Sequence, residues 1–268
     1  MHYLSIGAIF RMENSWLDEW IQYHHSLGVE YFYLVCHDSD TRVPDRILRP
    51  YIEKGMVNLQ YVKDMGGVDH SPSAWVQCEV YKKVIHYATE KTQWLALIDL
   101  DEFLLPRQSD DLRVFLQDYE KESSLVVNWN IFGTNGYIKR PETQINHLFH
   151  RAETYWQRNR FIKSIVRPER VICKEISDVH YFPVLSGYSV DENYRPIRTM
   201  WNDITTEKIR INHYVLRSWQ DFWEVKSQRS RSTHSSKCDL QYFEEHDRNE
   251  VFDDEISRRF GHFIDNQS

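Results

Sequence analysis

An apolar run that ends in carboxylates constrains the fold of this chain more than any other feature. Residues 94–98 are apolar, and Asp99, Asp101 and Glu102 follow directly. A short run without polar residues is typical of a strand that is covered on both faces, as in parallel sheets. Because side chains alternate along a strand, Asp99 and Asp101 are expected to point to the same side. Two carboxylates so close together repel each other unless a cation or a proton lies between them.

The end of this run is where an open α/β sheet binds its ligands, because ligands collect at the carboxyl ends of the strands. Carboxylate oxygens are hard ligands that suit Mg²⁺ or Mn²⁺. An isolated Asp-x-Asp triplet more often marks a simple acidic turn, and that alternative stays open. The triplet follows two strand–helix units, however, and this context favours a divalent-metal site formed by Asp99 and Asp101 at the mouth of the sheet.

Strands and helices are expected to alternate along the first half of the chain. This alternation predicts an α/β fold with a mostly parallel, Rossmann-like central sheet, right-handed crossovers and flanking helices. The expected strands are residues 3–10, 31–36, 57–62, 94 onward, 125–129, 162–167, 171–176, 180–182 and 211–215. The expected helices are residues 16–27, 44–54, 71–90, 110–122 and 219–226, the first preceded by a capping box of Ser15 and Asp18 and the third opened by Ser71 and Pro72.

The length of 268 residues suffices for one large α/β domain with an appendage. We expect residues 1–238 to form the domain and residues 239–268 to form an acidic, weakly helical tail that packs on it. Aromatic residues are abundant, with 9 Trp, 16 Tyr and 13 Phe, and such residues line sugar or nucleobase sites as well as ordinary cores.

Charge and cysteine spacing exclude several classes of protein. A net charge of −7 argues against nucleic-acid binding, which needs a basic surface. The four cysteines are far apart, so neither a zinc site nor a disulfide framework is indicated, and a reducing compartment fits best. The chain begins almost directly in a strand and has no apolar run of about 18 residues, so we expect a cytoplasmic protein that does not span a membrane.

Five blocks of sequence, in a fixed order, resemble glycosyltransferase family 92 and its bacterial relatives in the family-2-like group. The resemblance covers roughly residues 4 to 230, and five ordered blocks are far more specific than an Asp-x-Asp triplet alone. The blocks are Glu13-Asn14 with Leu17, Glu19-Trp20, Tyr23-His24 and residues 27–30; residues 94–106; residues 132–136; residues 163–168 with His180; and residues 212–214 with Arg217-Ser218.

The resemblance implies a GT-A fold that binds a nucleotide-sugar, with a metal ion bridging the Asp-x-Asp to the diphosphate. Known members move galactose from UDP-galactose with inversion. In this comparison Asp101 is the first choice as a metal ligand, and Asp99 shares the metal or holds the ribose. His213 is the expected third ligand, in keeping with the C-terminal histidines of other GT-A enzymes, although a strand histidine bonded to the backbone is the plainer alternative.

Basic residues are candidates to balance the charge of the diphosphate. These are Lys163, Arg217, Lys226 and Arg229, and each could instead be a solvated surface charge, an alternative that is favoured for Lys226 and Arg229. The family often has lysine at the position of Arg217. His180 is expected either beside the metal or acceptor, or simply packed in the core.

The nucleoside is expected over the ends of the first two strands, where Arg11, Glu13 and Asp38 lie. Asp38 could accept a hydrogen bond from uracil or ribose, but Asp-Ser-Asp is also ordinary turn sequence. Gln77, near the start of the third helix, could face the base.

An inverting transferase also needs a base beside the acceptor hydroxyl. Four carboxylates are candidates, and the sequence does not choose among them: Glu102, Glu142, Glu153 and Asp178. Glu102 belongs to the best-matched block, yet it could serve only to hold the loop.

The sequence therefore predicts a metal-dependent, UDP-sugar-dependent hexosyltransferase that acts on a glycan, such as a lipid-linked precursor of a bacterial surface polysaccharide. Trp219 and Trp223, beside basic residues, could touch the inner membrane peripherally, although packing in the core is favoured for both. A sugar nucleotidyltransferase is one alternative, but its usual glycine-rich basic loop is missing after the first strand. A non-catalytic carbohydrate-binding protein is another, and it leaves the Asp-x-Asp unexplained. No oligomeric state is indicated.

Overall fold

A mixed sheet forms the centre of the protein in the computed structural model, which describes residues 1–66, 74–229 and 238–265. The strands of the sheet are β1 (His2–Phe10), β2 (Tyr31–Cys36), β3 (Val57–Tyr61), β4 (Thr92–Leu97), β5 (Glu102–Pro106), β6 (Ser124–Ile131), β8 (Ile162–Val166), β9 (Ser189–Val190), β10 (Pro196–Ile197) and β11 (Ile209–His213). Outside it, β7 (His150–Arg151) pairs with β12 (Val251–Phe252).

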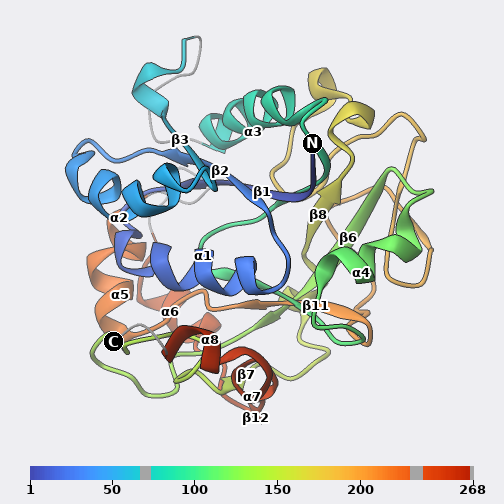
Figure 1. Cartoon of the computed structure of the whole chain (residues 1–268). Coiled ribbons are helices and arrows are strands. Elements are labelled where there is room, and N and C mark those ends of the chain that lie inside the picture. Colours follow the sequence, from blue (N-terminus) through green and yellow to red (C-terminus); the bar gives the residue numbers. More distant parts are fainter. Residues whose placement is uncertain (67–73, 230–237, 266–268) are drawn as a thin grey trace.

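The strand order is β10-β9-β6-β8-β4-β1-β2-β3, with β11 pairing with β6 and β5. Strands β3, β2, β1 and β4 are parallel, whereas β8 runs antiparallel between β4 and β6. The predicted α/β class, with a mostly parallel central sheet flanked by helices, is confirmed (Figure 1). Strand β4 lies between β1 and β8, so whatever follows β4 lies near the middle of the sheet edge.

Helices cover both faces of the sheet. They are α1 (Leu17–Ser26), α2 (Arg42–Glu53), α3 (Ala74–Ala88), α4 (Leu112–Leu116), α5 (Trp219–Glu224), α6 (Leu240–His246), α7 (Glu255–Phe260) and α8 (His262–Asp265). Figure 1 shows α1 and α3 on opposite sides of β1. Gly7 faces α3, and a Cβ at this position would lie 2.7 Å from Val84, so only glycine allows the helix to pack this close.

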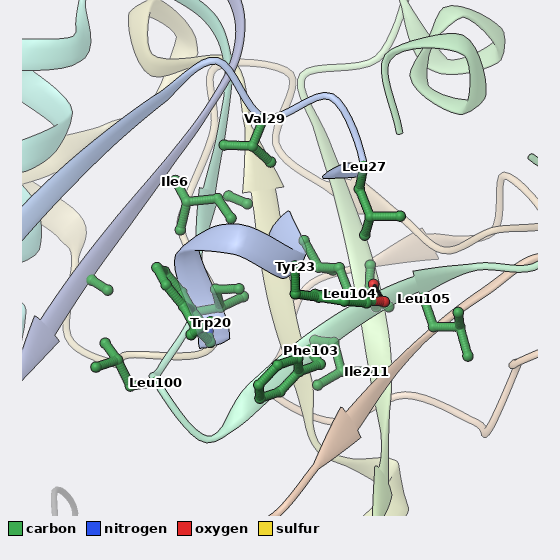
Figure 2. Packing of buried hydrophobic residues seen from close by; sticks show 14 of the residues in the cluster. Ile6, Trp20, Tyr23, Leu27, Val29, Leu100, Phe103, Leu104, Leu105 and Ile211 are labelled. Atoms are coloured by element: carbon green, nitrogen blue, oxygen red, sulfur yellow. Dashed lines mark hydrogen bonds between the residues drawn. The ribbon is translucent and has the colours of Figure 1, made fainter. Parts of the chain in front are cut away.

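Packing against α1 fixes the strand that follows the acidic turn. Figure 2 shows Trp20 and Tyr23 beside Phe103 and Leu104 of β5. The Trp20 indole donates a hydrogen bond to the carbonyl of Glu102 at 2.9 Å, and the Tyr23 hydroxyl donates to the carbonyl of Leu104 at 2.6 Å. All of these side chains are buried, so packing in the core fixes the position of the segment after β4.

The acidic triplet itself differs from the prediction. Strand β4 ends at Leu97, and residues 98–101 form a turn closed by a hydrogen bond from the Glu102 N–H to the Asp99 carbonyl at 3.1 Å. The Glu102 side chain stabilises the turn by accepting a hydrogen bond from the Asp99 N–H at 2.9 Å. The alternation rule therefore does not apply to Asp99 and Asp101, although both side chains face the same cavity, as described below.

Three further local predictions are wrong, and one lies outside the described residues. Residues 171–176 contain a short 3-10 helix, η6 (Cys173–Glu175), and residues 180–182 form no strand. Ser15 does not cap α1, because the 3-10 helix η1 (Asn14–Trp16) runs directly into it. The predicted start of the third helix at Ser71 and Pro72 falls in residues 67–73, which the structure does not describe.

The last part of the chain packs on the domain. Asp253 accepts hydrogen bonds from Arg151 and Arg210, each at 2.7 Å, and Ile256 and Phe260 are buried in the main core. Among the residues described, no helix combines the length and the apolar character that crossing a membrane requires.

Candidate active site

A cavity of about 590 Å³ lies at the carboxyl ends of β1, β4, β6 and β11. The residues that line the cavity follow the order of the strands in the sheet. One end is formed by the residues after β1 and by α3, and the other end by β6, the start of β8 and α6. Between them lie Asp99 and Asp101 from the turn after β4, together with His180 and His213. This edge of the sheet is the place where the sequence predicts a site.

Asp99 is held by three side chains. Its Oδ2 accepts a hydrogen bond from Lys163 Nζ at 2.8 Å, and its Oδ1 accepts from Gln77 Nε2 at 2.9 Å and from the Tyr81 hydroxyl at 3.3 Å. Burial opposes the ionisation of Asp99, but the ammonium of Lys163 keeps its pKa below the ordinary value. Asp99 is therefore a fixed carboxylate.

Asp101 lies between a lysine and a histidine. Its Oδ2 is 2.9 Å from Lys226 Nζ, and its Oδ1 is 3.5 Å from His213 Nε2. Burial opposes its ionisation, but Lys226 and His213 hold its pKa well below the ordinary value. Burial lowers the pKa of His213, so its imidazole is neutral, and its Nδ1 has no hydrogen-bond partner among the described residues.

The residues around Asp101 fit a divalent cation only in part. Two ligands at right angles and about 2.1 Å from Mg²⁺ lie roughly 3 Å apart, which is close to the separation of the Asp101 carboxylate and the His213 imidazole. In the described parts of the chain, no three His, Cys, Asp or Glu side chains gather to hold a metal, and both oxygens of Asp99 are already engaged. Mg²⁺ is often held by one or two protein groups and completed by substrate phosphates, and Asp101 with His213 fits that arrangement.

Lys163 is placed behind the site rather than in it. Its side chain is 1% exposed, and its ammonium lies 2.8 Å from Asp99 and 3.8 Å from Glu102. Burial opposes its charge, but the carboxylates of Asp99 and Glu102 raise its pKa above the ordinary value. The structure therefore places Lys163 as the counter-ion of Asp99, and it does not line the cavity.

Glu102 is also behind the wall of the cavity. It is fully buried, and burial raises its pKa well above the ordinary value, against the opposing effect of the nearby Lys163 ammonium. The hydrogen bond that it accepts from the Asp99 N–H gives it a role in holding the turn.

Glu13 lies on the cavity wall between two arginines. Arg217 Nη1 is 3.0 Å from its Oε1, and Arg229 Nη1 is 3.0 Å from its Oε2. Arg217 is buried outside the cavity, where Gln144 accepts a hydrogen bond from its Nε at 2.8 Å, whereas Arg229 lines the cavity. The predicted phosphate role therefore fits Arg229 better than Arg217.

Near the end of β1, Arg11 and Gln77 line the cavity, and Asp38 does not. The Asp38 carboxylate accepts hydrogen bonds from the Met12 N–H at 2.7 Å and from Asn14 at 3.2 Å. It thereby holds the turn after β1, where Met12 has a positive φ of 60°. The turn reading of Asp38 is the one that the structure supports.

His180 lines the cavity with a neutral ring. Its Nδ1–H donates to the carbonyl of Ile162 at 3.1 Å, which leaves Nε2 free of that bond. Burial, with the nearby charge of Lys163, lowers its pKa to about 4. Trp129 packs between His180 and His213, with ring centroids 5.2 Å and 4.3 Å away.

The remaining candidate bases are not part of the cavity wall. Glu142 and Glu153 are exposed elsewhere, and Asp178 accepts hydrogen bonds from the N–H groups of His180 and Tyr181. Sequence reasoning missed seven residues that line the cavity, because they come from irregular loops and from the tail: Arg158, Phe161, Met200, Trp201, Tyr242, Glu245 and His246. Abundant aromatic residues were the one available signal.

The chain is similar in sequence to known proteins. The model of glycosyltransferase family 92 matches residues 3–256. The chain belongs to glycosyltransferase family 92. A family 92 protein of Ricinus communis is 25% identical over 221 residues, covering 78% of this chain and 34% of the relative. A family 92 protein of Oryza sativa subsp. japonica is 23% identical over 224 residues, covering 82% of this chain and 34% of the relative.

This family 92 chain spans about a third of the length of the curated relatives that it matches. Among solved structures, HddC from Yersinia pseudotuberculosis is similar with a TM-score of 0.44 and 11% identity, covering 84% of this chain and 97% of that one.

Proposed function

We propose that this family 92 chain transfers a hexose, with galactose favoured, from a UDP-sugar to a hydroxyl group of a glycan, with inversion at the anomeric carbon. The observation that carries the proposal is the position of Asp99 and Asp101 in the middle of one cavity. Strand-end residues suited to a nucleoside lie on one side of the two carboxylates, and aromatic residues suited to sugar rings lie on the other.

The donor is proposed to lie along the β1 side. Arg11 and Gln77 would contact the nucleoside, and Lys226 and Arg229 would balance the diphosphate. Both cations lie at or directly after the 3-10 helix η7 (Lys226–Gln228) and rest on carboxylates, Lys226 on Asp101 and Arg229 on Glu13. Each can therefore exchange part of its carboxylate contact for a phosphate oxygen.

A Mn²⁺ or Mg²⁺ ion held by Asp101 and His213 would supply Lewis-acid stabilisation of the leaving diphosphate. Asp99, fixed by Lys163, is better suited to accept a hydrogen bond from a ribose hydroxyl. The metal thus depends on the donor for part of its coordination.

The acceptor is proposed to be a growing glycan, such as a lipid-linked precursor of a bacterial surface polysaccharide, reached from the cytoplasmic side of the inner membrane. Trp223 supports peripheral contact with such a surface, because it is 44% exposed. Trp219 packs against Phe222 and Phe243 and so fixes α5 to the rest of the fold.

A screen of donors tests the function. Thermal unfolding is followed with UDP-galactose, UDP-N-acetylglucosamine and a GDP-sugar, each with and without Mn²⁺, because a bound donor stabilises the folded state by mass action. We expect the largest shift and the fastest release of UDP with UDP-galactose and Mn²⁺. A preference for another donor would overturn the galactose assignment, production of pyrophosphate would favour a nucleotidyltransferase, and binding of sugars without turnover would favour a carbohydrate-binding protein.

A further inference from the structure

Some carboxylates on the cavity wall contact a lysine or an arginine, and one does not. Glu13 contacts Arg217 and Arg229, Asp99 contacts Lys163, and Asp101 contacts Lys226. Glu245 also lines the cavity, and within the described residues it has no lysine, arginine or histidine partner. Its Oε1 accepts one hydrogen bond, from Gln241 Nε2 at 3.0 Å.

Helix α6 presents Glu245 to the cavity together with two neighbours on the same face. Glu245 and His246 follow Tyr242 by three and four residues, and all three line the cavity. The helix is fixed at its start, where the Asp239 side chain accepts a hydrogen bond from the Tyr242 N–H at 2.9 Å, and Phe243 packs on Trp219. The helix that carries Glu245 therefore has a defined position, and Glu245 itself is exposed to solvent.

The position of α6 relative to the donor follows from its contacts. His246, next to Glu245, is close enough to Lys226 and Arg158 for their charges, added to burial, to lower its pKa to about 3. Lys226 contacts Asp101, so α6 borders the site of the proposed diphosphate. His246 itself is a poor base, because burial lowers its pKa to about 3, although its Nδ1–H donates to the Tyr242 carbonyl at 2.8 Å.

We propose that Glu245 is the catalytic base of the transfer, the group that takes the proton from the acceptor hydroxyl. This inference rests on the proposed function. The acceptor oxygen forms a bond to the anomeric carbon while the bond from that carbon to the diphosphate oxygen breaks, and UDP leaves with the bonding electron pair. The hydroxyl proton moves to the Glu245 carboxylate, so atoms and charge balance without any further reactant.

The chain offers a matched control for the test. Glu244 is the neighbouring residue on the same helix, is exposed and does not line the cavity. We would compare wild type, Glu245→Gln, Glu245→Ala and Glu244→Gln, and measure UDP binding by titration calorimetry and UDP release from UDP-galactose with water as the acceptor. Loss of a general base typically costs about 10²–10⁴-fold in rate. We expect that loss in both Glu245 variants, UDP affinity within threefold of wild type, and full activity in Glu244→Gln.

Azide provides the sharper readout, because it is an anionic nucleophile that carries no proton. With sodium azide, Glu245→Ala is expected to regain turnover and to form β-galactosyl azide, the inverted product of the α-linked donor. Glu245→Gln turnover within twofold of wild type, loss of UDP binding in that variant, or no azide rescue in Glu245→Ala would each overturn the assignment. Failure of the wild type itself to bind UDP or to turn over any nucleotide-sugar would instead overturn the proposed function.

Discussion

The ammonium of Lys226 lies 2.9 Å from the Asp101 carboxylate, at the position that a metal ion would neutralise in the proposed reaction. Both side chains are largely buried, and Asp101 has His213 on its other side. The free protein therefore carries its own counter-ion at this carboxylate. In the proposed function, a metal ion would compete with Lys226 for Asp101 until a diphosphate gave the lysine a second anion to contact.

The competition predicts opposite effects of Lys226→Met on two ligands. Mn²⁺ binding without nucleotide is expected to become tighter, because the competing cation is gone, whereas UDP affinity is expected to fall about 10-fold or more, since a hydrogen bond between charged groups contributes about 1.5–3 kcal/mol. Titration calorimetry measures both. Lys139→Met, which alters an exposed lysine outside the cavity, is the control, and unchanged affinities for both ligands would contradict the prediction.

Replacing Asp101 by asparagine is expected to remove the metal dependence of UDP binding. The amide keeps the shape of the side chain but has no charge to attract the ion. At a UDP concentration of 100 times Kd, the wild type gains about 2.7 kcal/mol of stability, and the Mn²⁺-dependent part of this gain should vanish in Asp101→Asn. Asp203→Asn, at a highly exposed position, serves as the comparison in thermal unfolding. A Mn²⁺-dependent shift that survives in Asp101→Asn would argue against this ligand.

Lys163→Met is expected to destabilise the fold by about 1–3 kcal/mol, because Asp99 loses the cation that holds it while its carboxylate stays partly exposed to solvent in the cavity. Asp99 would then lie near Asp101 and Glu102 with no cation of its own. Urea unfolding measures the free energy of unfolding. A loss below 1 kcal/mol would show that Asp99 finds another partner or takes up a proton.

A buried histidine gives the fold a pH dependence of known sign. His24 donates from Nδ1 to the Trp20 carbonyl at 2.8 Å, and its Nε2 accepts from the Leu104 N–H at 3.3 Å. Burial lowers its pKa from 6.5 to about 3, so the unfolded chain binds this proton more readily than the folded protein does. The stability contributed by the neutral ring is complete above pH 6.5 and is lost as the pH falls toward 3.

The measurable consequence is a difference in slope between wild type and His24→Gln. One proton changes the free energy of unfolding by about 1.4 kcal/mol per pH unit. Below about pH 6, the variant is therefore expected to lose stability less steeply by that amount, although it is less stable at pH 7.5. Other buried histidines contribute equally to both proteins and cancel in the difference. Parallel curves from urea unfolding at several pH values would refute the assignment.

Trp201 is expected to support the acceptor sugar. Its side chain is 41% exposed, lines the cavity and packs on Phe161 with ring centroids 3.8 Å apart. In saturation-transfer NMR with methyl β-galactoside and UDP, Trp201→Ala should lose the sugar signal, Trp201→Phe should retain part of it, and UDP affinity should not change. Trp223→Ala is matched in exposure but lies away from the cavity, and an equal loss there would show that the contact is unspecific.

Much of the parallel half of the sheet could be predicted from sequence, because β1, β2 and β3 have apolar blocks bounded by turns and each is separated from the next by a clear helical stripe. The strand predicted at residues 171–176 is absent, because these residues pack against a second hydrophobic cluster, which includes Tyr81 and Phe182, from a segment that contains the 3-10 helix η6 and not from a strand ladder. Local pattern does not distinguish these two ways of burying the same side chains.

The two central carboxylates were found because they follow a buried strand. Their partners were harder to rank. The sequence suggests a phosphate ligand at Lys163, but on β8 this side chain lies behind the cavity, where it contacts Asp99. The sequence favours a surface charge at Lys226, but this lysine contacts Asp101 in the cavity. Glu245 carries no motif at all, and its role depends on where the tail returns to the domain, which is a tertiary property.

The return of the tail has a consequence for shortened forms of the chain. Tyr242, Glu245 and His246 close the cavity, and they follow the carboxylates of the β4 turn by more than 100 positions. A chain truncated before Asp239 would keep both carboxylates of the β4 turn but would lack these three residues of the cavity wall.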